Sequence, residues 1–504
     1  MEVMESLVRF IASQDSSVVN LQQGTLLERF YNELAVGRIE DESAAARLLY
    51  DAEASDPRYQ RLKSDLKKRL YEAPLLFDPQ KLGRTDRQQA YFQCAKDGAV
   101  VKILFGKHKR EAAIQLSKKL LQLAEKYEFT EVALGTHKLL RIHYGTWTSE
   151  PKQYEHHNKH YKHYQRLWQW EAKAEEYFTE LTLQYVQDKS LKTETRDQAQ
   201  TYYDELAAPL QEYDAYQLHL CGRLIQLAIA SSVDDHEATV RCCEDAMAFF
   251  RSKPYQAHAP LQIFSYQQLL AYIQLRRYEA GRKLVQASEE WLQEGDFNWF
   301  KFQEGYLKLA FHTQQYTDAY NTFMRVVEHS RFRYLPSELK EVWRIYEAYL
   351  HYVLWMGAVD VKQPAKRFNK FRLGKFLNET PIFSKDKRGM NVTILIIQIL
   401  FLIAREKYDT VIDKAEAVEK YCSRYLKKDE TFRSNCFIKM LLQMPKSAFH
   451  PAAVRRHTDK LLKKLKQYPS QAITNAHDIE ILPYEALWAF ALASLDQQQR
   501  ANMR

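Results

Sequence analysis

Histidine side chains cluster in one short part of the sequence and are the residues best suited to chemistry. His156 and His160 are four positions apart, so on a helix they would share one face and could chelate a divalent metal ion. The zinc-protease pattern needs Glu directly after the first His, and His157 stands there instead. A solvated helix face, or one that stacks on a base or a peptide, fits the same residues, and we expect no metal site. The clustered histidines are His143, His156, His157, His160 and His163.

Motifs that hold phosphate or activate a nucleophile are missing from the sequence. Phosphate-binding loops need closely spaced glycines, because backbone amides must approach the anion. The two nearest glycines are Gly98 and Gly106, which excludes the dinucleotide-binding fingerprint and the P-loop. No GxSxG elbow is present either. We therefore expect a protein that is not an enzyme and needs no cofactor; an enzyme with its site near His143 and residues 156–163 is the last alternative.

A basic segment at residues 361–390 is the strongest candidate for a binding surface. Nine cations against Glu379 and Asp386 give it a charge of +7, most of the chain's +9. Four phenylalanines alternate with the cations, and this mixture suits an acidic peptide, nucleic-acid phosphate or an anionic surface. An ordinary helix with inward Phe residues and Lys stems along its surface fits equally well. The residues predicted to bind a partner are Lys366, Arg367, Lys370, Arg372, Lys375, Lys385, Lys387 and Arg388.

A second basic element lies near the N-terminus. Two short helices precede a third that starts at Pro57, a residue favoured in the first turn of a helix. Leu62, Leu66 and Leu70 form the apolar stripe of this third helix. Two short helices followed by a basic amphipathic helix resemble a helix-turn-helix arrangement. The six cations of the third helix could therefore contact nucleic acid. The six are Arg58, Arg61, Lys63, Lys67, Lys68 and Arg69.

The elements that position these residues follow a helical-repeat pattern. The tripeptides at 236–238, 278–280 and 317–319 each open an apolar run, and their alanines lie 42 and 39 residues apart. This spacing is typical of one helix-turn-helix repeat unit. Glycine and proline number only 14 each, which favours long helices joined by short turns. We therefore predict an all-α fold, a right-handed α-solenoid of stacked antiparallel helix pairs after a small N-terminal helical region.

Two resemblances extend this interpretation. The segments 278–281 and 316–320, with a weaker copy at 408–412, resemble the opening of the second helix in tetratricopeptide repeats. The resemblance covers about residues 100–440 and implies that fold, with a protein or peptide as ligand. The stretches 371–403 and 419–443 resemble a group of uncharacterised bacterial helical-repeat proteins, which implies a bacterial cytoplasmic origin.

The predicted organisation has four sections. Residues 1–83 form the N-terminal helical region, and 84–200 hold long helices rich in aromatic residues and His. Residues 201–360 contain the clearest repeats. Residues 361–504 hold the basic segment and further helices, and five polar residues there could extend the acid-binding face: Arg424, Lys427, Lys428, Arg433 and Asn435.

Cysteine usage and the apolar runs indicate a cytoplasmic protein. The six cysteines include no CxxC pair, which favours buried free thiols in a reducing compartment. The N-terminus lacks the cationic region of a signal peptide. The longest apolar run, 392–404, has 13 residues, whereas a membrane-spanning helix needs about 20. We predict a buried core helix there and no membrane partner.

The sequence leads to one main functional hypothesis and one alternative. The main hypothesis is a scaffold that binds a protein or peptide partner, expected to be acidic, through the basic-aromatic surface. The alternative is a nucleic-acid-binding regulator with the N-terminal basic helix and a repeat sensor region, whose binding would weaken steeply with salt.

Overall fold

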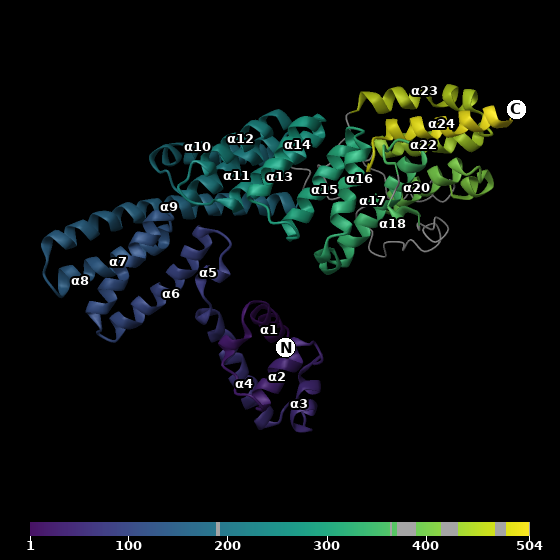
Figure 1. Cartoon of the computed structure of the whole chain (residues 1–504). Coiled ribbons are helices and arrows are strands. Elements are labelled where there is room, and N and C mark those ends of the chain that lie inside the picture. Colours follow the sequence, from purple (N-terminus) through teal and green to yellow (C-terminus); the bar gives the residue numbers. More distant parts are fainter. Residues whose placement is uncertain (188–191, 363–364, 370–389, 415–431, 469–479, 503–504) are drawn as a thin grey trace. The chain divides into compact units, whose positions relative to one another are not determined.

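Helices account for every regular element that the structure describes. The computed structural model describes residues 1–187, 192–362, 365–369, 390–414, 432–468 and 480–502. The all-α prediction is therefore confirmed for these residues. The chain divides into two compact units, and Figure 1 labels the helices from which they are built. Unit 1 consists of Met1–Glu176, Leu206–Cys221 and Lys253–Ala257, and unit 2 consists of Tyr177–Glu205, Gly222–Ser252 and His258–Arg504.

The N-terminal part of unit 1 is a helical bundle with its own core. Side chains of Thr25, Asp41 and Asp56 cap three of its helices by accepting hydrogen bonds from backbone amides. Phe30 and Tyr59 are fully buried where these helices meet. Three helices match the predicted ones, and the first was not predicted. The bundle comprises α1 (Glu2–Gln14), α2 (Leu26–Ala35), α3 (Glu42–Tyr50) and α4 (Pro57–Glu72), with 3₁₀ turns η1 (Ser16–Val19) and η2 (Ala73–Leu76).

The remainder of unit 1 is built from consecutive antiparallel helices. Helix α6 packs against α7, and α7 packs against α8. The segment 253–257 joins them, because the backbone amide of Gln256 donates to Asp86 at 3.0 Å. These helices are α5 (Pro79–Leu82), α6 (Asp86–Gly106), α7 (Arg110–Lys126), α8 (Thr130–Thr146) and parts of α9 (Pro151–Gln187), α10 (Lys192–Glu212) and α11 (Tyr216–Ser232).

Unit 2 continues the pattern of neighbouring helix pairs. Helix α12 packs against α13, α13 against α14 and α15, and α16 against α15 and α17. Its elements are α12 (His236–Arg251), α13 (His258–Leu275), α14 (Tyr278–Ala287), η3 (Ser288–Glu290), α15 (Phe297–His312), α16 (Tyr316–Val327), η4 (Ser330–Tyr334), α17 (Ser337–Trp355), α18 (Lys366–Asn369), α20 (Met390–Ala404), α22 (Phe432–Lys446), α23 (Pro451–Gln467) and α24 (Tyr484–Asn502).

The apolar run at 392–404 forms α20, which packs against α17 and α24. Ile396, Ile397 and Leu400 have no exposed surface, so the predicted buried core helix is confirmed. Among the described helices, none is long and apolar enough to cross a membrane.

One turn geometry recurs between successive helices. Arg276 and Gln314 have φ of +53° and +60°, and each stands two residues before the start of the next helix. The amide that follows each of them bonds the carbonyl five residues earlier, at 2.9 and 2.8 Å, which is a common way to close a helix. The three predicted tripeptides accordingly open α12, α14 and α16. The same turn occurs at His108, Glu128, Asp234 and Glu406.

Two glycines permit close packing among α13, α14 and α15. A Cβ on Gly281 would lie 2.2 Å from Leu309 Cδ2, and one on Gly305 would lie 2.9 Å from Leu269 Cδ2. Both distances are shorter than van der Waals contact. Glycine at these two positions therefore lets the three helices approach one another closely.

Candidate binding site

The basic segment at 361–390 is described only in part. Arg367 pairs with Glu347 of α17 through two hydrogen bonds of 2.5 and 3.0 Å. Phe368 is buried beside Tyr320 and Phe323, whereas Lys366 is exposed. This short stretch follows the ordinary pattern of inward Phe and outward cations. The remaining predicted residues lie outside the described part of the chain: Lys370, Arg372, Lys375, Lys385, Lys387 and Arg388.

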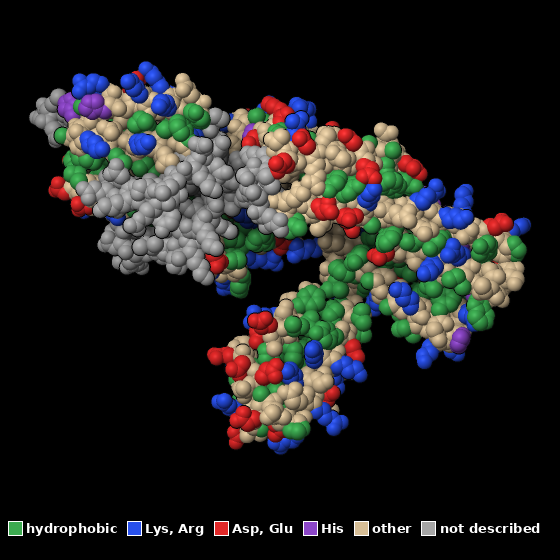
Figure 2. All heavy atoms as spheres, turned by 180° about the vertical axis from the view of Figure 1, so that it is seen from behind, with side chains coloured by type: hydrophobic (Ala, Val, Ile, Leu, Met, Phe, Trp, Pro, Cys, Tyr) green, Lys and Arg blue, Asp and Glu red, His purple; other side chains and the backbone are tan. Residues whose placement is uncertain are grey.

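The N-terminal basic helix α4 has an apolar face and a mixed polar face. Leu66 and Leu70 are buried in the bundle, as the predicted stripe requires. Three of its cations have partners: Lys63 pairs with Glu42 at 2.6 Å, Arg58 pairs with Asp56 at 2.8 Å, and Arg69 donates to the Asn20 carbonyl. Arg61, Lys67 and Lys68 are exposed. Figure 2 shows acidic and basic side chains interspersed on the visible face of this bundle.

Arg433 corrects one expectation from the sequence. Its side chain is 8% exposed and donates two hydrogen bonds to Glu480, at 2.9 and 2.7 Å, and one to Glu485 at 2.8 Å. It also bonds the carbonyl of Leu465 at 2.7 Å. A buried guanidinium with all these partners ties α22 to neighbouring segments, and it is not part of an acid-binding surface.

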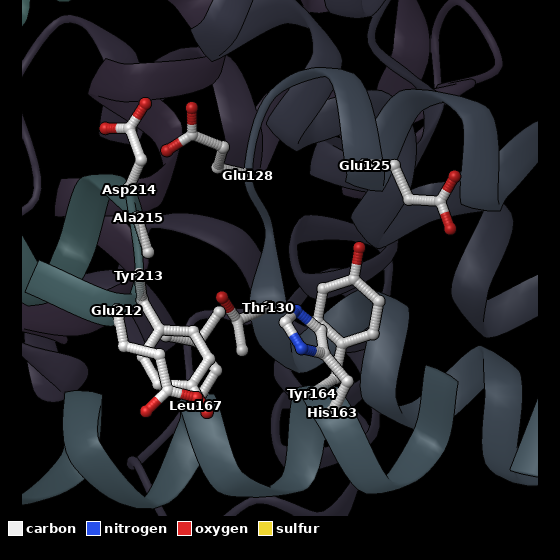
Figure 3. Close-up of a pocket in the computed structure, with 10 residues that line it drawn as sticks. All are labelled: Glu125, Glu128, Thr130, His163, Tyr164, Leu167, Glu212, Tyr213, Asp214 and Ala215. Carbon is white, nitrogen blue, oxygen red and sulfur yellow. The ribbon is translucent and has the colours of Figure 1, made fainter. Parts of the chain in front are cut away.

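A pocket of about 210 Å³ opens in unit 1. Figure 3 shows Asp214 and Glu128 close together on one side of it and Glu125 on another side. Four segments supply the wall: the end of α7, the start of α8, the middle of α9 and the connection between α10 and α11. The lining residues are Glu125, Glu128, Thr130, His163, Tyr164, Leu167, Glu212, Tyr213, Asp214 and Ala215.

Lys253 forms ion pairs with two of the four carboxylates that line this pocket. Its ammonium group bonds both carboxylate oxygens of Glu128, at 2.9 and 3.0 Å, and Oδ1 of Asp214 at 2.9 Å. The backbone amide of Tyr216 also donates to Glu128, at 2.6 Å. Because Lys253 is only 8% exposed, these bonds compensate for burying its charge. One cation is therefore shared by two acids.

The pocket has a net negative charge. The four lining carboxylates outnumber the two cations beside them, which are Lys253, paired with two of the acids, and Arg166, which acts electrostatically on His163 and Tyr213. Glu125 is 43% exposed along its side chain, and its hydrogen bond with His137 lowers its pKa, which favours the ionised form. Glu212 is exposed. Partial desolvation lowers the pKa of His163, which favours the neutral form of this lining imidazole. Such a site attracts cations.

A buried carboxyl group lies behind the pocket. The Thr130 hydroxyl, which lines the pocket, donates to Oε1 of Glu171 at 2.9 Å. Glu171 is 6% exposed, and burial raises its pKa to about 7 in spite of this hydrogen bond. It therefore changes charge near neutral pH.

The histidine cluster includes a residue that the sequence did not single out. His137 of α8 and His157 of α9 place their Nδ1 atoms 2.9 Å apart, and His137 Nε2 lies 3.3 Å from Oε1 of Glu125. Since one Nδ1 must donate to the other, the two rings cannot both carry a hydrogen on Nδ1. Burial lowers the pKa of His157 to about 4. His137 gave no sequence signal, because it lies 19 residues before the nearest of the α9 histidines.

The predicted pairing of His156 and His160 on one helix face is confirmed, with ring centroids 4.3 Å apart. His143 is separate from them and packs against Phe105 and Tyr144. Within the described ranges, no group of three His, Cys, Asp or Glu residues is arranged to hold a metal ion.

Comparison of the chain with protein-family models, curated proteins and solved structures finds no match. The tetratricopeptide-like solenoid therefore stays a prediction, and the function of the pocket has to be inferred from its geometry and charge.

Proposed function

We propose that this chain is a non-enzymatic helical scaffold that binds a protein or peptide partner, and that its unit 1 pocket receives a lysine or arginine side chain of that partner. The observation that carries this proposal is the set of four carboxylates around one opening, two of which are paired with Lys253. A cation that enters would gain charge-assisted hydrogen bonds from Glu125 and Glu212. The rings of Tyr164 and Tyr213 offer cation–π contacts as well.

The size of the pocket supports a side chain rather than a complete small molecule. Pockets for small-molecule ligands usually measure about 300–1,000 Å³, and this pocket has about 210 Å³. One Lys or Arg side chain needs less room, and the rest of the partner can lie on the surrounding helices. In this proposal the pocket recognises one Lys or Arg of the partner, and contacts between the partner and the surrounding helices supply the rest of the binding affinity.

The basic segment remains a candidate for a second contact, with an acidic part of the partner, through Lys366 and the cations that follow it. A bacterial cytoplasmic setting, which the resemblance implies, fits the cysteines. Five of them are free and buried in the described residues, as expected in a reducing compartment.

A displayed library of random peptides tests the pocket assignment. The wild-type protein should enrich peptides with Lys or Arg at a shared position. The double variant Glu125→Gln/Glu212→Gln should lose that enrichment about tenfold or more, because two charge-assisted hydrogen bonds are removed while the Lys253 network stays intact.

The matched control is Glu111→Gln/Glu131→Gln, which neutralises two exposed acids of α7 and α8 outside the pocket. It should select the same peptides as wild type. Enrichment without a shared cation, or equal losses in both variants, would contradict the assignment.

A further inference from the structure

The hairpin formed by α22 and α23, residues 432–467, concentrates positive charge. It contains nine Lys and Arg residues and one acidic residue, Asp459, so its formal charge is nine minus one, or +8. The whole chain has +9. The hairpin and the basic segment at 361–390, with +7, are therefore the two strongly positive parts of the chain, and all other residues together carry nine minus eight minus seven, or −6.

The positive charge lies along one exposed side of α23. Val454, Thr458 and Leu465 are buried and hold the helix in unit 2. The exposed side presents Arg456, Lys460 and Lys464, at steps of four residues. With a rise of about 1.5 Å per residue, these cations stand about 6 Å apart along the helix axis. Figure 2 shows Lys and Arg side chains gathered at the upper left, over this part of unit 2.

Helix α22, which packs against α23, carries two further exposed lysines. Lys439 of α22 and Lys464 of α23 both act electrostatically on the buried thiol of Cys436, so each ammonium group lies within electrostatic range of that side chain. Lys439 and Lys446 are exposed and are seven residues apart, which places them on one side of α22.

Most of these cations have no acidic partner among the residues that the structure describes. Lys463 pairs with Asp459, Arg455 pairs with Asp496, and Arg433 is buried with its two glutamates. The other six have no carboxylate within 4 Å among the described residues. They are Lys439, Lys446, Arg456, Lys460, Lys464 and Lys466.

We propose that this α22–α23 face binds the phosphate backbone of a nucleic acid. Lysine is depleted from the cores of protein–protein interfaces, which rely on aromatic and apolar anchors. The side of α23 with Arg456, Lys460 and Lys464 presents charge instead of such anchors. Regularly spaced ammonium groups suit a chain of phosphates, and they contact it without reading its sequence. This inference is independent of the pocket.

Fluorescence anisotropy with a labelled 30-base-pair random-sequence DNA tests the proposal, and a 30-nucleotide single-stranded RNA distinguishes the two sources of phosphate. The variant is Arg456→Gln/Lys460→Gln/Lys464→Gln. At 100 mM salt it should bind about tenfold more weakly or worse, and its slope of log K against log salt should be shallower by about 2 to 3.

The matched control is Arg61→Gln/Lys67→Gln/Lys68→Gln, which removes three exposed cations of α4. Circular dichroism and thermal unfolding show whether both variants stay folded. Weaker binding only in the α23 variant supports the proposal. Three outcomes would overturn the proposal. The wild type binds neither nucleic acid, the α4 variant alone loses binding, or poly-glutamate of the same length displaces the labelled DNA as effectively as unlabelled DNA does.

Discussion

At the residue scale, burial sets the charge of the ionisable groups beside the pocket, and two of them respond to pH in opposite directions. Burial raises the pKa of Glu171 to about 7 and lowers that of His157 to about 4. Both side chains are therefore neutral at pH 6. Protonation of His157 would destabilise the fold at acidic pH, whereas ionisation of Glu171 affects stability at higher pH.

The change Glu171→Gln should stabilise the protein, and the effect should grow with pH. In the unfolded chain this carboxyl ionises near its ordinary pKa of 4.5, whereas in the folded protein it stays protonated up to about pH 7. Wild type therefore loses stability as pH rises from 4.5 to 7, and the variant does not. Urea unfolding should show a gain in the free energy of unfolding that is about 2–3 kcal/mol larger at pH 8 than at pH 4.5.

The control for this experiment is Glu176→Gln on the exposed side of the same helix, which should leave the pH dependence unchanged. A gain from Glu171→Gln that is the same at both pH values would show that Glu171 ionises normally in the folded protein.

At the element scale, helix openings could be predicted from sequence and helix endings could not. Asp56-Pro57 and the three tripeptides start helices as expected, because caps and apolar periodicity are local signals. The recurring left-handed turns gave no signal, since positions such as Arg276 and Gln314 are not occupied by glycine. Helix α1 and the basic side of α23 were not predicted; the cations of α22 and α23 are less dense in the sequence than those at residues 361–390.

The change Gly281→Ala tests the packing of α14 on α15. The new methyl group would meet Leu309 Cδ2 at 2.2 Å, so Leu309 must move, at a cost of about 1–3 kcal/mol in the free energy of unfolding. Gly135 of α8 is the matched control, because nothing lies within 4 Å of its Cβ position. Gly135→Ala should stabilise by about 0.5–1 kcal/mol. If Gly281→Ala also raised the melting temperature, α14 and α15 would not lie as close together at Gly281 and Leu309 as the structure places them.

At the scale of the whole molecule, the all-α class followed from the sequence, but the candidate site did not. Glu125 and Asp214 are 89 residues apart, and Lys253 follows after another 39. Local patterns carry no information on which distant acids converge, because the path of the chain between them decides it. The same limit applies to His137, whose role depends on the packing of α8 against α9.

The separation of charge is also a property of the whole molecule. The pocket in unit 1 is acidic, and the α22–α23 hairpin in unit 2 is basic. A single ligand chemistry cannot suit both, so the two sites call for ligands of opposite charge. Selective loss of one binding activity in each set of variants is therefore expected.

The most direct measurement of the central claim is a double-mutant cycle by isothermal titration calorimetry. The tightest peptide from the display selection is compared with a copy in which its shared Lys or Arg is replaced by Met, against wild type and Glu125→Gln/Glu212→Gln. If the pocket receives that side chain, the two changes should couple by about 1 kcal/mol or more. Additive effects, within about 0.5 kcal/mol, would place the cation elsewhere and contradict the account.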